Sequence, residues 1–324
     1  MTMKAIVARD YGPIEKLDYA DWPDPEATGR TVVIDAEAIG VNYPDGLLVQ
    51  GLYQSKPPTP FIPGMEMAGR VSAVGEGVTK FKVGDRVVSF TPLGAYAEKI
   101  GVDESSVVRL PDGVSAADAC ALICGYGTSH HALKQRAQLK PGETLAVLGA
   151  AGATGLAAIQ IGKIMGAKVI AVASTPEKRE IARAAGADIT LGYENLKDAL
   201  KEATEGKGVD VGYDPVGGDA FDTLARSMAW NGRLLVIGFT SGRIPQFPIN
   251  LALVKGFSLV GVFWGTFTQK EPAAHEENMR ELVGWLLEGR LKPVIEGTYP
   301  LAEAGEVLTR IHNRAVAGKL ILRP

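Results

Sequence analysis

The stretch 144–174 constrains the fold of this chain more than any other. It reads TLAVLGAAGATGLAAIQIGKIMGAKVIAVAS: an apolar run, a glycine-rich turn, apolar residues at helical spacing, then a second apolar run. That order predicts a strand, a turn, a helix and a buried second strand, because the apolar period changes along it. The unit is typical of a doubly wound parallel sheet.

The turn itself indicates a ligand. Gly149, Gly152 and Gly155 follow the spacing G-x-x-G-x-x-G, which departs from the usual G-x-G-x-x-G by placing two alanines after the first glycine. Small residues let the backbone approach a pyrophosphate, and the positive end of the helix from Gly155 to Gly166 favours its charge. We therefore expect a dinucleotide here. The alternative is a glycine-rich turn in another kind of α/β domain.

The end of the second apolar run bears on which dinucleotide binds. An NAD site usually has an acidic residue there, whereas this chain has Ala173, Ser174 and Thr175, followed by Lys178 and Arg179. A carboxylate would repel a 2′-phosphate, and hydroxyl and basic side chains would bind one. The sequence therefore predicts NADPH rather than NADH. Alternatively, Lys178 and Arg179 are ordinary charged residues of an exposed helix.

Length and composition limit the other possibilities. A chain of 324 residues exceeds the size at which one core keeps growing, so two domains are expected. The net charge of -3 and the lack of a long basic run argue against nucleic-acid binding, and no apolar run is long enough for a membrane span. We expect a cytoplasmic protein. Cys120 and Cys124 are the two cysteines, too few for a disulfide framework.

The periodicity divides the chain into two kinds of structure. Short stretches of period two fill the first third, and strands alternate with helices from Thr144 onwards. We expect a mostly antiparallel, barrel-like domain over 1–123 and 265–324. A doubly wound domain is expected over 124–264, with the chemistry in the cleft between the domains.

Six stretches, spread in order over nearly the whole chain, carry a family resemblance. They are GVNYPD (40–45), PFIPGMEMAG (60–69), VGDRV (83–87), GAYAE (94–98), the turn 148–155 and FWG (263–265). Together they resemble the medium-chain dehydrogenase/reductase superfamily, and specifically the zinc-free quinone oxidoreductase branch that includes zeta-crystallin. The resemblance implies a Rossmann sheet that binds NADPH and a GroES-like barrel domain.

The resemblance also makes an expectation about metal. Zinc-dependent members have a Cys where this chain has Asn42 and a His where it has Met65. Cys124 stands near the position of a third ligand, and Glu66 keeps the acidic residue beside the lost His. One thiolate cannot hold a catalytic zinc, which takes three protein ligands, so we expect no metal site. The simpler interpretation of both cysteines is small, buried, apolar residues on a helix.

Hydride transfer without zinc suits an acceptor that is already electron-poor, such as a quinone or an α,β-unsaturated carbonyl. By resemblance, Asn42 donates a hydrogen bond to the developing oxyanion, Tyr53 stacks or donates, and Asp45 orients. Each has a structural alternative: Asn42 as a turn residue, Tyr53 as an anchoring aromatic, and Asp45 as the cap of the following helix.

Further cofactor contacts are implied by the resemblance alone. Gly152, Ala153 and Thr154 would contact the pyrophosphate and the nicotinamide side, and Tyr193 would lie by the 2′-phosphate. The remaining candidates are placed near the nicotinamide or over the bound dinucleotide. They are Thr128, Gly238, Phe239, Phe263, Trp264 and Arg314. Trp264 is also an ordinary candidate for the core.

The segment FSLVGVFW (257–264) is apolar and uncharged, and we expect it to form the last strand of the parallel sheet. Such an edge pairs readily with another chain, and the family resemblance implies a homodimer through it. Two other functions stay open. One is a zinc-free reductase of 2-alkenals, enones or enoyl thioesters. The other is an RNA-binding or structural crystallin-like protein that keeps NADPH binding.

Overall fold

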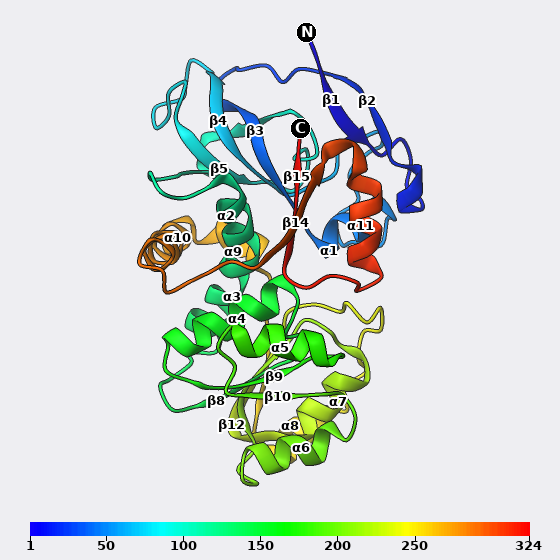
Figure 1. Cartoon of the computed structure of the whole chain (residues 1–324), viewed down its shortest axis with the longest axis vertical. Coiled ribbons are helices and arrows are strands. Elements are labelled where there is room, and N and C mark those ends of the chain that lie inside the picture. The colour runs from blue at the N-terminus through cyan, green and yellow to red at the C-terminus, as the bar shows by residue number, and fades with distance from the viewer. The chain divides into compact units, whose positions relative to one another are not determined.

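The computed structural model describes all 324 residues, which form two compact units (Figure 1). The first unit comprises Met1–Cys124 and Pro293–Pro324, and the second comprises Gly125–Lys292. The chain therefore returns to the first unit at 293, and not at 265 as we expected from the sequence.

The segment 265–292 stays with the second unit because its helices α9 (Trp264–Lys270) and α10 (Pro272–Leu287) are bonded to that unit. The ammonium of Lys134 lies 2.6 Å from the carboxylate of Glu281 on α10. The side-chain amide of Gln135 donates to Asn278 Oδ1 at 2.8 Å. The same face of α10 carries the buried apolar residues Met279 and Leu282, so this face packs against the second unit.

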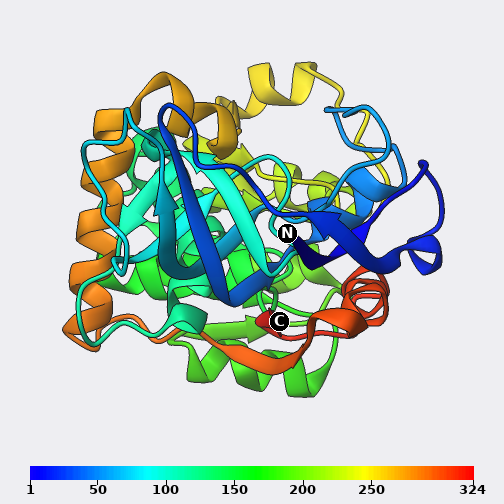
Figure 2. The same ribbon diagram turned by 90° about the horizontal axis from the view of Figure 1, so that it is seen from above.

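The first unit is built on a seven-stranded sheet. Its order is β14-β15-β3-β4-β5-β7, with β6 also paired to β3, and every pairing except β14–β15 is antiparallel. The strands are β3 (Thr31–Val41), β4 (Glu66–Val74), β5 (Arg86–Phe90), β6 (Lys99–Asp103), β7 (Val107–Arg109), β14 (Ile295–Pro300) and β15 (Lys319–Arg323). Figure 2 gives a second view of its blue and cyan strands.

Other elements complete this unit. The strands β1 (Thr2–Val7) and β2 (Asp18–Pro23) form a separate antiparallel pair. The helices are α1 (Tyr43–Val49), α2 (Ala116–Ala121) and α11 (Ala304–His312). Apolar residues from β1, β3, β4, β5 and α11 share one core, which includes Ile34, Met67 and Leu308. This mostly antiparallel architecture confirms the predicted fold class of the N-terminal part.

The second unit contains six parallel strands in the order β10-β9-β8-β11-β12-β13. They are β8 (Thr144–Val147), β9 (Lys168–Val172), β10 (Ile189–Leu191), β11 (Val209–Asp214), β12 (Met228–Val236) and β13 (Ser258–Gly261). The chain builds outward from β8 in one direction and from β11 in the other, so the topological switch point lies between them. Ligands of such sheets bind at the carboxyl ends of the strands at this point.

Helices precede and connect these strands. They are α3 (Gly127–His131), α4 (Ala153–Ile164), α5 (Pro176–Ala184), α6 (Leu196–Ala203), α7 (Gly218–Arg226) and α8 (Asn250–Lys255). Figure 1 shows α4 and α5 on one side of the sheet and α6 and α7 on the other, as in a doubly wound fold. The predicted Rossmann sheet is confirmed.

The C-terminal edge of this sheet differs in detail from the prediction. Strand β13 is the edge strand, but it covers only Ser258–Gly261 of the apolar segment, and Trp264 begins α9.

None of the helices combines the length and apolar character that a transmembrane span requires.

Candidate active site

The glycine turn follows β8 and leads directly into α4. Gly149 has a φ of +58°, a conformation that favours glycine, and its N–H donates to the Tyr193 hydroxyl at 3.0 Å. The N–H of Gly152 donates to Gly149 O at 2.9 Å. Gly152 is the N-cap of α4, and no side chain caps the helix, so no side chain accepts from the N–H groups of its first turn.

A third glycine of the turn is required by packing. A Cβ on Gly155 would lie 2.4 Å from Gly149 O and 2.9 Å from Ala150 Cα, so only a hydrogen fits there. The close approach holds the start of α4 against the turn. The three glycines of the spacing therefore have different structural roles: Gly149 has a positive φ, Gly152 is the N-cap of α4, and Gly155 allows the close approach.

The side chain of Ser129, on α3, also contacts the start of α4. Its side chain is completely buried, and its Oγ lies 2.9 Å from Thr154 O and 2.8 Å from the Tyr213 hydroxyl. It thus ties α3 to α4 and to β11. Sequence reasoning selected the neighbouring Thr128, which is half-buried in α3, and missed Ser129. A serine in GTSHH carries no signal by itself, because its partners are distant in sequence.

The end of β9 carries the residues predicted to select the cofactor. Ser174 is exposed, and Thr175 caps α5 by accepting from the Lys178 N–H at 3.2 Å. The guanidinium of Arg179 reaches back to Ala173 O at 3.5 Å. No carboxylate occupies 173–175. Ser174 follows the end of β9, which is paired with β8 next to the glycine turn, and Lys178 lies in the first turn of α5.

Asp214 is a buried acid at the end of β11 that sequence reasoning missed. Its Oδ1 accepts from the N–H groups of Val216 at 2.7 Å and Gly217 at 2.9 Å. Its Oδ2 is buried without a hydrogen-bond partner, and burial raises the pKa of this carboxyl to about 6. The carboxyl shapes the loop beside Gly149, since Val216 packs against that glycine. The sequence signal for this residue was a single Asp directly before the motif PVGG (215–218).

The other predicted cofactor residues are dispersed. Gly238 and Phe239 follow β12 and are half-buried. Phe263 is 58 % exposed, whereas Trp264 is 4 % exposed and meets His275 edge-on at 5.6 Å between ring centroids. The contacts of Trp264 are those of a core residue.

Arg314 belongs to the first unit. It follows α11 with a φ of +56°.

The first unit contains a buried polar cluster around Asn42, which lies between β3 and α1. The Asn42 amide nitrogen donates to Glu66 Oε1 at 3.0 Å, and its amide oxygen accepts from the Lys319 ammonium at 2.8 Å. Glu66 and Lys319 also form a direct ion pair, and their side chains are 0 % and 2 % exposed. Burial opposes the charge of Lys319, but the Glu66 carboxylate outweighs it and raises the pKa of the ammonium.

Lys319 was not among the predicted residues, and Glu66 was considered only as a neighbour of a lost zinc ligand. The signal for Lys319 is a single lysine that opens the final apolar run, KLIL. Nothing in that pattern distinguishes a buried lysine from one at an exposed strand end. The pairing of β15 with β3 brings it to Asn42.

Asp45 lies in the first turn of α1 and is fully buried. Its Oδ2 accepts from the Asn42 N–H and from the Tyr96 hydroxyl, both at 2.8 Å, and its Oδ1 has no partner. Burial raises the pKa of this carboxyl to about 7, against the opposing effect of these hydrogen bonds and of Lys319. These contacts make Asp45 a cap of α1 that holds the Asn42 backbone.

The raised pKa predicts a pH dependence of stability. The unfolded chain releases the Asp45 proton near pH 3.8, whereas the folded protein holds it up to about pH 7. The free energy of unfolding therefore falls as the pH rises through this window, by about 2 kcal/mol between pH 5 and 7. Asp45→Asn keeps an acceptor for both donors and does not titrate. Urea unfolding at pH 5 and 7 should show a smaller loss in this variant, and equal losses would contradict the assignment.

Tyr53 and the two cysteines have different surroundings. Tyr53 is half-buried against a small apolar cluster that includes Met65, and burial raises the pKa of its phenol. Cys120 is fully buried, its thiol donates to Ala38 O at 3.3 Å, and burial raises its pKa. Cys124 is half-buried.

These residues do not fit a zinc ion. Nowhere in the chain do three or more His, Cys, Asp or Glu side chains come together as a possible metal site. Asn42 and Met65 supply an amide and a thioether, and the acid beside them, Glu66, is already paired with an ammonium. The donor set therefore lacks the three ligands that a catalytic zinc takes.

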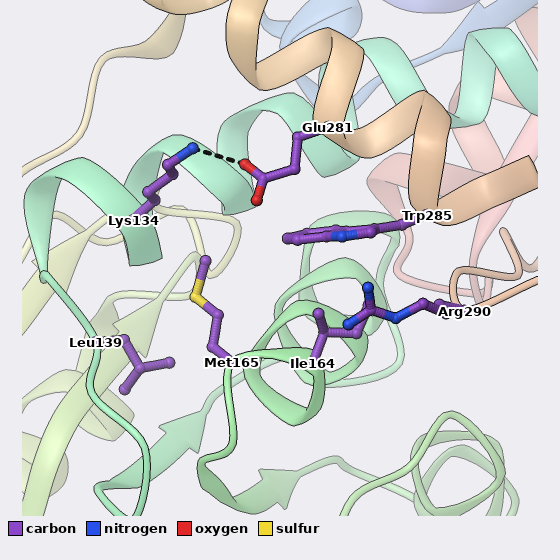
Figure 3. Close-up of a pocket in the computed structure, with 7 residues that line it drawn as sticks. All are labelled: Lys134, Leu139, Ile164, Met165, Glu281, Trp285 and Arg290. Carbon is purple, nitrogen blue, oxygen red and sulfur yellow. Dashed lines mark hydrogen bonds and ion pairs between the residues drawn. The ribbon is translucent and has the colours of Figure 1, made fainter. Parts of the chain in front are cut away.

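A cavity of about 460 Å³ lies elsewhere in the second unit (Figure 3). Lys134 and Glu281 face each other on one side of it, and Arg290 lies 5.5 Å from the ring centroid of Trp285. Ile164, the last residue of α4, also lines it. The cavity is thus at the end of α4 opposite the glycine turn, and none of the predicted residues lines it.

Comparison with known proteins identifies the family. Residues 28–112 match the alcohol dehydrogenase GroES-like domain, and residues 153–283 match the zinc-binding dehydrogenase family. The quinone oxidoreductase-like protein 2 of Rattus norvegicus is 36% identical over 99% of this chain and 88% of its own length. The chain belongs to the quinone oxidoreductases of the medium-chain dehydrogenase/reductase superfamily. The resemblance inferred from the six sequence stretches is confirmed.

Solved structures place this quinone oxidoreductase homologue in the same fold. The quinone oxidoreductase of Pseudomonas syringae pv. Tomato DC3000 is 36% identical with a TM-score of 0.94, covering 99% of this chain and 100% of that one. The Escherichia coli quinone oxidoreductase, solved as a complex with NADPH, is 30% identical with a TM-score of 0.93 over the same shares. The protein is therefore an oxidoreductase of this family.

Proposed function

We propose that this protein transfers hydride from NADPH to a quinone or a similar electron-poor acceptor without zinc. The observation that carries the proposal is the contact set of Asn42. Its amide is held by Glu66 and Lys319, so the position offers a fixed hydrogen-bond donor where a metal would need ligands. The E. coli relative with bound NADPH supports the choice of cofactor.

NADPH supplies the hydride when it is bound, and the second unit carries the residues proposed to hold it. Gly149, Gly152 and Gly155 shape the turn, and the N–H groups of Ala153 and Thr154 are in the first turn of α4, as a pyrophosphate requires. The other proposed contacts are Thr128, Ser174, Lys178, Tyr193, Gly238, Phe239, Phe263, Trp264 and, in the first unit, Arg314.

Asn42 is the proposed donor to the acceptor oxygen. An amide nitrogen has two hydrogens, and only one of those on Asn42 has a partner within the chain, Glu66. The second is available for the oxyanion that develops when hydride reaches the acceptor. Tyr53 is proposed to contact the acceptor ring, and Asp45 acts through the Asn42 backbone.

The test is oxidation of NADPH followed by absorbance against quinones, 2-alkenals, enones and enoyl thioesters, with and without a chelator. Turnover of quinones that survives chelation supports the proposal. Turnover confined to enals or thioesters would assign the protein to a different reductase class. Tight NADPH binding without turnover of any acceptor would favour an RNA-binding or crystallin-like role. Loss of activity with chelator would contradict the zinc-free mechanism.

Lys178→Glu tests the proposed 2′-phosphate site. Replacing the ammonium by a carboxylate removes a charge-assisted bond and adds repulsion, so the KM for NADPH should rise by about 10- to 100-fold. The KM for NADH should change little. Arg183→Glu reverses a charge in the last turn of the same helix, is the matched control and should affect neither cofactor. Equal effects of Lys178→Glu on both cofactors would remove the assignment.

We further propose that the protein is a homodimer through the edge strand β13. Leu259 of β13 is 39 % exposed, and the preceding helix α8 with its N-cap exposes Ile249 at 81 %, Leu253 at 82 % and Val254 at 73 %. An unpaired edge with such a patch favours pairing with a second copy.

Light scattering on a gel-filtration column should give about twice the mass of one chain. Leu253→Asp with Val254→Asp should shift it toward a monomer. A native protein that elutes as a monomer at every concentration would contradict the dimer.

A further inference from the structure

The two ends of the Asn42 side chain are held by groups that cannot exchange roles. The Lys319 ammonium only donates hydrogen bonds, and it meets Asn42 Oδ1 at 2.8 Å. The Glu66 carboxylate only accepts, and it meets Asn42 Nδ2 at 3.0 Å. Turning the amide over would place N–H groups against the ammonium and the oxygen against the carboxylate. One orientation of the amide is therefore strongly preferred.

We propose that Lys319, together with Glu66, is a positioning residue for hydride transfer that keeps the N–H end of the Asn42 amide available to the acceptor oxygen. This inference rests on the proposed function of Asn42. The reversed amide would present lone pairs to an oxygen that gains negative charge, and it would oppose the reaction. The cation at Oδ1 also polarises the amide and strengthens its remaining N–H as a donor.

Burial makes this device effective. Lys319 and Glu66 are 2 % and 0 % exposed, so water does not screen the charges of the ion pair that holds the amide. The lysine opens β15, whose Leu320–Leu322 pair with β3, and Glu66 is on β4, the neighbour of β3 on its other side. The pairing of three strands thus brings the charged pair and the amide together in a buried position.

The alternative is that Lys319 only neutralises Glu66 and supports folding. A double-mutant cycle on kcat separates the two roles, using the acceptor that turns over fastest in the panel. Asn42→Ala should lower kcat by about 10²-fold or more, as for the loss of an oxyanion donor. Lys319→Met should lower kcat by about tenfold or more in the native background. In the Asn42→Ala background it should have no further effect, because the group it positions is gone.

Two further variants keep the test decisive if Lys319→Met fails to fold. Lys319→Met with Glu66→Gln removes the ion pair without leaving an unpaired charge, and it should show the same loss of kcat with an unchanged KM for NADPH. Lys319→Arg retains a group that only donates and should rescue most of kcat.

Two outcomes would overturn the inference. One is a loss of kcat on replacing Lys319 that is equally large in the native and the Asn42→Ala backgrounds, because this is the signature of a purely structural role. The other is native kcat in the double variant that lacks the ion pair. An Asn42→Ala variant with native kcat would instead defeat the proposed role of Asn42, so the two failures are distinguishable.

Discussion

Replacing Glu66 with leucine should lower the free energy of unfolding by about 3–5 kcal/mol, because the change leaves a buried cation without its counter-ion. Lys319 is 2 % exposed, and it also donates a hydrogen bond to the neutral amide of Asn42. The ammonium must then either lose its proton or draw water into the first unit. Urea unfolding at pH 7.5 measures the loss.

Two controls test whether the loss of stability comes from the unpaired buried charge. Glu66→Leu combined with Lys319→Met removes both charges and should recover most of the stability, because an apolar pair tolerates burial. Glu276→Leu breaks the exposed pair of Glu276 and Arg280, whose side chains are 71% and 73% exposed, and should change stability by less than about 0.5 kcal/mol. A Glu66→Leu variant as stable as the native protein would show that the lysine is not held as a buried cation.

Gly155→Ala is expected to impair both the turn and cofactor binding. The new Cβ would lie 2.4 Å from Gly149 O and 2.9 Å from Ala150 Cα, both backbone atoms of the turn that cannot yield without moving it. We expect a loss of about 1–3 kcal/mol in the free energy of unfolding. Loss of two hydrogen bonds to a charged pyrophosphate would raise the Kd for NADPH by about 100-fold.

Gly284→Ala is the matched control, since Gly284 lies within the helix α10 and a Cβ there meets no atom within 4 Å. It should stabilise the protein by about 0.5–1 kcal/mol and leave NADPH binding unchanged. Fluorescence titration with NADPH and thermal unfolding measure both variants. A Gly155→Ala variant with native affinity would mean that the turn does not bind the pyrophosphate.

Local patterns made most of the fold predictable. The period of apolar residues changes around Thr144, and the structure begins its parallel sheet at that residue. The border at 265 was wrong because an amphipathic helix shows that one face is buried without showing against which surface. Helix α10 presents Asn278 and Glu281 to partners in 134–135, a relation that is absent from any local window.

The candidate site was predictable only where its residues are close in sequence. The spacing of the three glycines reports directly on the turn, because one backbone segment makes all its contacts. The Asn42 cluster is different: its members lie on β4, on β15 and before α1, and only the pairing of strands brings them together. Lys319 and Ser129 were missed for this reason, as each draws its role from partners far along the chain.

The position of β15 has a consequence for the order in which the nascent chain can fold. Residues Leu320–Leu322 pair with Ile39–Val41 of β3. Synthesis of the residues between the two strands takes on the order of tens of seconds, and that part of β3 is unpaired during this time. The second unit is one continuous segment and all its strands emerge earlier. Translation that stops before Lys319 leaves Glu66 without its counter-ion and β3 with an open edge, so the first unit matures only in molecules whose synthesis has passed that residue.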